Sequence, residues 1–161
     1  MSGNAPKVKV PSLEGMRVAV ISARWHKEIC EALVAGAKRA IYEAGIKDTN
    51  EIFVPGSFEL PLAAQFALKS GADAAVVLGV VLRGETPHFD YVCQGVTDGV
   101  MQVSLSLDKP IGFGVLTVDT IEQAIARSGV PGSKEDKGYD SAIAALDLLR
   151  LKREGGDRFG K

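Results

Sequence analysis

The chain has 161 residues, of which 46% are apolar and 24% charged, enough for one domain with a sizeable hydrophobic core. The formal net charge is −1 and no dense run of lysine or arginine occurs, so binding to nucleic acid or to a membrane surface has no electrostatic support. No apolar run reaches the roughly 18 residues that a membrane span needs, and residues 1–11 lack the apolar core of a signal peptide. We therefore expect a single domain over residues 1–161, located in the cytoplasm.

Short apolar runs alternate with amphipathic segments along the chain, and Gly and Pro separate them. The run at residues 74–82 is nearly all apolar without alternation, which is typical of a parallel strand covered on both faces. The amphipathic segments repeat their apolar residues at three- and four-residue steps, the pattern of a helix with one buried stripe. The predicted strands cover residues 17–22, 51–54, 74–82 and 111–117, and the predicted helices cover residues 26–44, 57–70, 89–107, 120–128 and 137–151.

Both ends of the chain are expected to be flexible tails. Residues 1–15 contain Pro, Gly and Lys, and residues 154–161 are polar and rich in Gly. The brief alternation at Val8 and Val10 would also allow the first segment to add as an edge strand to a neighbouring subunit.

Four β–α repeats in succession predict an α/β fold of three layers, α/β/α, around a four-stranded parallel sheet in flavodoxin-like order. Right-handed crossovers place every strand-to-helix turn along one edge of such a sheet, and that edge is where open α/β sheets bind ligands. The four turns are residues 22–26, 54–59, 82–88 and 113–120.

The first two turns offer groups that could hold a ring and hydroxyl groups. Trp25 has a flat face for an aromatic ring, although a tryptophan in the core is the alternative. Residues 55–59 open a helix with Ser57 as a plausible N-cap, and free N–H groups at a helix start can bind hydroxyls or an anion. A plain capped helix start would give the same pattern.

The third turn and the last break could supply proton transfer and phosphate binding. His88 is the best candidate for moving protons, because an imidazole can donate or accept near neutral pH, although a lone histidine at a helix start is more often structural. Gly84-Glu85-Thr86 would suit phosphate contact through backbone amides. Arg127 and Lys137 flank the break between the last two helices and could add positive charge, with surface solvation as the ordinary alternative.

The sequence does not support a metal site, a redox site or several well-known types of hydrolytic site. Cys30 and Cys93 lie in separate predicted helices and are expected to be buried free thiols, and with only two histidines in the chain no metal site is expected. The chain lacks the P-loop, the G-x-G-x-x-G fingerprint, H-E-x-x-H and G-x-S-x-G. Nucleotide hydrolysis, nicotinamide chemistry, zinc proteolysis and the α/β-hydrolase mechanism therefore lose support.

Five segments give the sequence a resemblance to the lumazine synthase (6,7-dimethyl-8-ribityllumazine synthase) family of riboflavin biosynthesis. They are residues 22–25 (SARW), 54–61 (VPGSFELP), 78–92 (LGVVLRGETPHFDYV), 113–117 (FGVLT) and 136–138 (DKG). The resemblance implies a transferase that condenses 5-amino-6-(D-ribitylamino)uracil with 3,4-dihydroxy-2-butanone 4-phosphate. The products would be 6,7-dimethyl-8-ribityllumazine, phosphate and water, formed without a metal or an organic cofactor.

The resemblance also implies a role for each matching residue. Trp25 would stack on the pyrimidine, Val81 and Leu82 would meet its edge, and Ser57, Phe58 and Glu59 would bind the ribityl chain. Gly84, Glu85 and Thr86 would hold the phosphate together with Arg127, and His88 would move protons. Phe113 and Lys137 would bind the pyrimidine and ribityl parts of the substrate from a neighbouring subunit, because sites in this family lie between adjacent subunits of a pentamer.

The segment between Arg127 and residues 136–138 is longer than expected for family members that form an icosahedral shell of twelve pentamers. We therefore expect an isolated pentamer rather than a 60-subunit particle. Two other functions stay open: a non-catalytic flavin- or nucleotide-binding module of flavodoxin type, and an inactive shell-forming protein. The presence of Glu59, His88, Arg127 and Lys137 argues against an inactive shell, which could have lost them.

Overall fold

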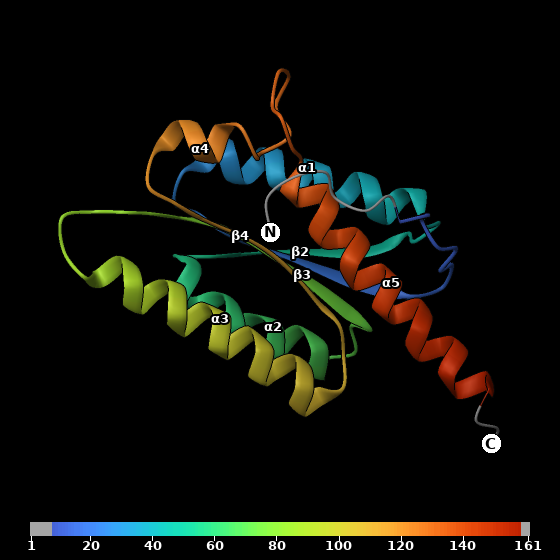
Figure 1. Ribbon diagram of the computed structural model, residues 1–161. Helices are drawn as coiled ribbons and strands as arrows, with labels where there is room; N and C mark the ends of the chain where they lie inside the picture. The colour runs from blue at the N-terminus through green and yellow to red at the C-terminus, as the bar shows by residue number, and fades with distance from the viewer. Residues whose placement is uncertain (1–7, 159–161) are drawn as a thin grey trace.

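The computed structural model of the chain describes residues 8–158, and Figure 1 shows a central sheet with helices on both of its faces. The strands are β1 (Arg17–Ala23), β2 (Asp48–Val54), β3 (Ala74–Leu82) and β4 (Ile111–Val118). The helices are α1 (Lys27–Glu43), the 3₁₀ turn η1 (Ser57–Glu59), α2 (Leu60–Lys69), α3 (His88–Leu107), α4 (Ile121–Ile125) and α5 (Lys137–Arg158).

All strand pairs of the sheet are parallel, in the order β2-β1-β3-β4. The flavodoxin-like, three-layer α/β/α prediction is therefore confirmed. β3 lies between β1 and β4, and eight of its nine residues are buried, which explains why its sequence shows no polar alternation.

The two neighbours of β3 end at different points along it. β1 pairs with β3 only as far as Ser22, which lies opposite Leu78, whereas β4 accompanies β3 to Leu82. The last four residues of β3 therefore have a strand partner on one side only. Because β1 leads into α1 on one face and β3 into α3 on the other, this open edge lies at the switch point of the sheet, where α/β folds bind ligands.

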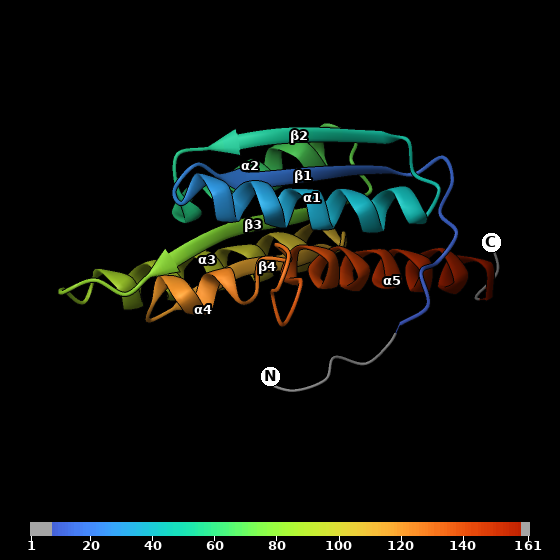
Figure 2. The ribbon, with the colours of Figure 1, turned by 90° about the horizontal axis from the view of Figure 1, so that it is seen from above.

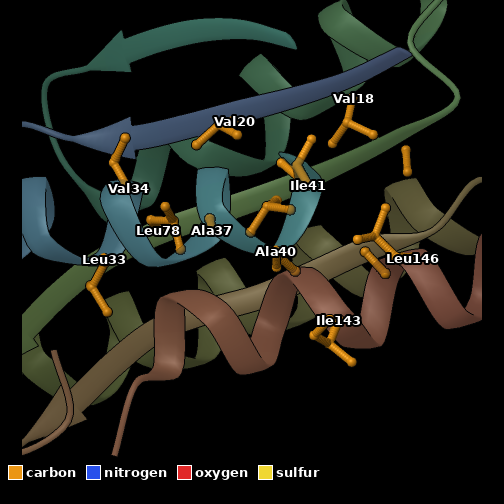
Figure 3. Close-up of a cluster of buried hydrophobic side chains, with 14 of the residues drawn as sticks. Val18, Val20, Leu33, Val34, Ala37, Ala40, Ile41, Leu78, Ile143 and Leu146 are labelled. Atoms are coloured by element: carbon orange, nitrogen blue, oxygen red, sulfur yellow. The ribbon is translucent and has the colours of Figure 1, made fainter. Parts of the chain in front are cut away.

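Each face of the sheet is covered by its own helices, with α1 and α5 on one face and α2 and α3 on the other (Figures 1 and 2). Alternate residues of the strands separate the two cores: Val18 and Val20 face α1, while Ala19 and Ile21 face α2. Figure 3 shows the first core, in which side chains of β1, β3, α1 and α5 meet.

Small residues bring α1 and α5 close together. A methyl group at Gly138, in the first turn of α5, would overlap the backbone carbonyl oxygen of Leu33 in α1. A methyl group at Gly36 would overlap the carboxylate of Asp136. That carboxylate accepts hydrogen bonds from Arg39 of α1 at 2.7 Å and from the backbone N–H of Tyr139 at 2.9 Å. The Asp136-Lys137-Gly138 segment thus fixes the start of α5 against α1.

Several boundaries differ from the sequence prediction. α5 was predicted to end near residue 151, but it continues to Arg158, and Arg150 bridges Asp147 and Glu154 along its surface. β2 begins at Asp48, three residues before its predicted start. Both extensions consist largely of charged and polar residues, so the apolar pattern of the sequence does not indicate them.

The N-terminal segment is only partly described, since residues 1–7 lie outside the described residues. Leu13 is fully buried, and its N–H donates to the carbonyl oxygen of Ala44 at 2.8 Å. Residues 8–15 form no strand within this chain. The expectation that they add to a neighbouring subunit stays a prediction.

Candidate active site

The carboxyl ends of the strands form one rim, on the left in Figure 2. The turns after β1 and β2 are joined there by a hydrogen bond from the Arg24 N–H to the Val54 carbonyl oxygen, 3.0 Å long. Trp25 lies on this rim with 68% of its surface exposed, so it is not a core tryptophan. A methyl group at Gly56 would lie 3.6 Å from Cδ1 of Trp25. The indole therefore stands beside the start of η1.

The η1 turn presents Glu59 and Phe58 and hides Ser57. Oε2 of Glu59 accepts from the Gly56 N–H at 2.9 Å, which closes the turn and leaves the rest of this exposed carboxylate available. Phe58 is 61% exposed, and a methyl group at Gly95 of α3 would lie 2.7 Å from its ring. Phe58 thus packs edge-on against a bare stretch of α3 while keeping a free face.

Ser57 is not the N-cap that the sequence predicted. Gly56, with an extended backbone, is the N-cap of η1, and Glu59 is the N-cap of α2, which begins at Leu60. The Ser57 side chain is buried, and within the described part of the chain its Oγ atom has no hydrogen-bond partner. Oγ fills the space beside Gly79 of β3, where a methyl group would lie 2.5 Å from it.

The turn from β3 to α3 projects farthest from the sheet at the left of Figure 2. Its residues from Gly84 to His88 are exposed, and His88 is the first residue of α3. Val81 is buried against the α3 face and Leu82 is half-buried, so a ligand at the open edge of β3 would meet their backbone groups rather than the Val81 side chain.

Arg83 anchors this turn, although sequence reasoning did not single it out. Its Nε donates to Asp119 at 2.7 Å, its Nη1 to Asp90 at 3.4 Å, and its guanidinium lies 4.1 Å from the centre of the Phe89 ring. The hydrogen bond from Arg83 to Asp119 raises the pKa of Arg83 above its ordinary value. Its place directly before the glycine of a strand-to-helix turn was the only signal in the sequence.

Arg127 and Lys137 lie together, but not at this turn. They flank the connection between α4 and α5, which folds back on itself through the bridge Ser128–Asp136 and lies apart from the β3–α3 turn in Figures 1 and 2. The Lys137 N–H donates to the Arg127 carbonyl oxygen at 2.9 Å. Both side chains also contact the carboxylate of Glu135, another residue that the sequence did not single out.

Phe113 also lies away from the rim. It is the third residue of β4, opposite Val77 in the middle of β3, and 40% of its surface is exposed at the edge of the sheet. The structure thus divides the predicted site residues into two groups. Trp25, Phe58, Glu59 and the turn carrying His88 share one rim, whereas Phe113, Arg127 and Lys137 lie elsewhere on the same chain.

A cavity of about 280 Å³ opens on the α1 side of the rim, and the sequence did not predict it. Ser22, Ala23, Arg24, Lys27, Cys30, Glu31 and Phe53 line it. Cys30 is buried, its thiol donates to the Trp25 carbonyl oxygen at 3.1 Å, and burial raises its pKa to about 11. It is therefore a neutral thiol near neutral pH; Cys93 is only half-buried, and both cysteines are free.

Two absences concern residues 8–158, the part of the chain that the structure describes. Among these residues no cluster of three or more His, Cys, Asp or Glu side chains could hold a metal ion. None of the helices described is long and apolar enough to span a membrane.

Comparison with known proteins gives one consistent result. Residues 15–153 match the family model described as 6,7-dimethyl-8-ribityllumazine synthase. Three curated relatives carry the same name. The one from Streptomyces coelicolor is 54% identical over 147 residues, which cover 91% of each chain. The one from Kineococcus radiotolerans is 52% identical over 150 residues, 92% of each chain.

The third relative, from Clavibacter michiganensis subsp. michiganensis, is 54% identical over 154 residues, which cover 94% of this chain and 96% of that one. A match of this identity over nearly the whole of both chains extends well beyond the rim residues. The chain belongs to the 6,7-dimethyl-8-ribityllumazine synthase family.

Proposed function

We propose that this chain condenses 5-amino-6-(D-ribitylamino)uracil with 3,4-dihydroxy-2-butanone 4-phosphate to form 6,7-dimethyl-8-ribityllumazine, phosphate and water. The observation that carries the proposal is the rim itself. An exposed indole, an exposed carboxylate and an exposed histidine surround the open edge of β3 in a chain of this family.

The pyrimidine substrate fits the first part of the rim. Trp25 supplies an exposed face on which a ring can stack, and the open edge at Val81 and Leu82 supplies backbone donors and acceptors for the ring's edge. The ribityl hydroxyls meet Glu59, the exposed ring of Phe58 and the backbone of the η1 turn. The buried Ser57 hydroxyl faces Gly79 instead, so its contribution comes through its backbone N–H.

The phosphate substrate fits the projecting turn. Gly84, Glu85 and Thr86 offer backbone N–H groups to the phosphate, and His88 lies two residues further on. The amine of one substrate attacks the ketone of the other to form an imine with loss of one water, phosphate leaves by elimination, and a second amine closes the ring with loss of a second water. Each step moves a proton, which an imidazole can carry.

The remaining residues come from a second copy of the chain. Arg127 and Lys137 share Glu135 and a backbone hydrogen bond, so one subunit supplies both of them, together with Phe113 of its exposed edge. A homo-pentamer, as the family resemblance implies, brings such residues to the rim of a neighbour. The projecting connection between α4 and α5 favours isolated pentamers over a 60-subunit shell. The free cysteines are compatible with a cytoplasmic location.

The direct test is to mix the purified protein with both substrates and follow the absorbance of the lumazine. We expect His88→Ala to lower kcat by about 10²-fold while leaving measurable turnover, because holding two reactive substrates together supplies much of the acceleration. His26→Asn is the matched control: it replaces the other histidine at a left-handed position that asparagine tolerates, and activity should stay. A wild-type protein that forms no lumazine but binds FMN stoichiometrically would contradict the proposal.

A further inference from the structure

The carboxylate of Glu135 lies beside Arg127 and Lys137, the two positively charged residues that the proposed function places in the substrate site. Its Oε2 lies 3.2 Å from Nζ of Lys137 and 3.9 Å from Nε of Arg127, and the second distance is that of an ion pair without a hydrogen bond. The hydrogen bond of the Arg127 guanidinium goes instead from Nη1 to the carbonyl oxygen of Gln123, at 2.9 Å. Nζ of Lys137 also lies 3.3 Å from Asp140. Burial alone would lower the pKa of Lys137, but the hydrogen bonds to Glu135 and Asp140 outweigh it and raise that pKa above its ordinary value. Lys137 therefore stays charged.

The backbone enforces this arrangement. The N–H groups of Lys134 and Glu135 both donate to the carbonyl oxygen of Ala126, at 3.0 and 3.1 Å, and the N–H of Lys137 donates to that of Arg127. These backbone hydrogen bonds keep Arg127, Glu135 and Lys137 close together on the two arms of one short hairpin. The Glu135 side chain is 27% exposed, so the carboxylate is partly shielded from water but still reaches the surface.

The cluster is electrically balanced. The positive charges of Arg127 and Lys137 are cancelled by the negative charges of Glu135 and Asp140. A phosphate monoester binds the same N–H donors that a carboxylate binds, and it brings three oxygens and up to two charges to them. A phosphate at Nε of Arg127 and Nζ of Lys137 would compete with the Glu135 carboxylate for both groups.

We propose that Glu135 is a specificity-determining residue, an internal anion that occupies Arg127 and Lys137 until the phosphate-bearing substrate displaces it and that returns when phosphate leaves. The inference rests on the proposed function of these two cations. It has two consequences. Small anions bind weakly, because they must compete with a tethered carboxylate, and the phosphate released in the reaction does not remain on the cations.

The test is Glu135→Gln, since glutamine keeps the size of the side chain and can still accept from Lys137 while the negative charge is lost. We expect the affinity for inorganic phosphate, measured by titration calorimetry and by inhibition of lumazine formation, to rise roughly three- to tenfold, the scale of two partly exposed ion pairs. The KM for the phosphate substrate should fall in parallel. The gain should shrink at 1 M salt, where charges are screened beyond about 3 Å.

Glu122→Gln is the matched control, because it removes the same charge from nearby α4, and among the described residues no lysine or arginine pairs with this carboxylate. Its phosphate affinity should equal that of the wild type. Glu135→Asp, which keeps the charge on a shorter side chain, should fall between wild type and Glu135→Gln, and circular dichroism verifies that each variant is folded.

An unchanged phosphate affinity in Glu135→Gln would overturn the inference. A weaker affinity would overturn it as well, because Glu135 would then orient the two cations rather than compete for them. The calorimetric measurement needs no turnover. A protein that forms no lumazine therefore contradicts the proposed function without deciding the role of Glu135, and the phosphate titration decides that role by itself.

Discussion

The two helical layers that cover the sheet bury different shares of their residues within one chain. We call the α1/α5 layer, which buries more, the finished layer, and the α2/α3 layer the unfinished layer. α1 buries eight of its 17 residues against the sheet and α5, whereas α3 buries only four of its 20. Leu62 and Phe66 of α2 and Met101 and Leu105 of α3 all remain exposed. The α1/α5 layer is therefore more nearly completed within one chain, and in the proposed homo-pentamer another copy would cover the α2/α3 layer.

The same division separates the site residues. The rim turns that carry Phe58 and His88 lead into the unfinished layer, through η1 and α3, whereas Trp25 lies directly before α1. The hairpin that carries Arg127 and Lys137 belongs to the finished layer, through Asp136 and its hydrogen bonds to α1 and α5. If the proposed homo-pentamer forms through the α2/α3 layer, stability and assembly depend on opposite faces of one sheet, and variants on each face should fail in different ways.

The finished layer should break most severely at Gly138. In Gly138→Ala the new methyl group would overlap the backbone carbonyl of Leu33, which cannot move without shifting α1. We expect a loss of about 3 kcal/mol in the free energy of unfolding, or no soluble protein, which chemical denaturation would measure. Gly155→Ala is the control in the same helix, where no atom of the described residues lies within 4 Å of the added methyl group, and it should instead gain up to about 1 kcal/mol. Equal effects of the two changes would contradict this packing.

The unfinished layer should fail in assembly rather than in folding. Leu105 is 74% exposed on α3, and burying a charge there in a contact between subunits is costly. We expect Leu105→Lys to weaken subunit association at least tenfold in analytical ultracentrifugation, with an unchanged circular dichroism spectrum and a loss of activity that follows dissociation. Leu148→Lys, at a 52% exposed leucine of α5, should leave assembly intact. If the α5 variant dissociates and the α3 variant does not, the faces have been assigned the wrong way round.

The fold was predictable from the sequence because its signals are local and consistent. Residues 74–82 read as a buried strand, and β3 covers that range without correction. The errors fall where polar residues continue an element, as at the end of α5, where Arg150 pairs with Asp147 and Glu154 along the helix surface. Such pairs leave no periodic pattern in the sequence.

The site was less predictable, because its geometry depends on contacts between distant segments. The pattern gave Trp25 and His88 as rim residues, and both are exposed there. The pattern could not predict the hydrogen bond between Arg83 and Asp119, which are 36 residues apart. Nor could it predict that the Glu135 carboxylate lies between Arg127 and Lys137. Ser57 misled for the same reason: a serine before a helix suggests a cap, but only the packing against β3 shows that its hydroxyl turns inward.

Ser57 also provides the smallest and most discriminating of these tests, because it lies where the rim meets the core of the unfinished layer. A buried hydroxyl without a protein partner carries a desolvation cost, so Ser57→Ala should raise the free energy of unfolding by about 1 kcal/mol. Gly79→Ala is the complementary change: its methyl group would lie 2.5 Å from the hydroxyl, so it should destabilise the wild type more than it destabilises the Ser57→Ala protein. The KM for the pyrimidine substrate should stay the same in Ser57→Ala, since the backbone N–H of residue 57 is retained. A raised KM with unchanged stability would mean that the hydroxyl turns outward to the substrate, and the inward packing against Gly79 would then not describe the working enzyme.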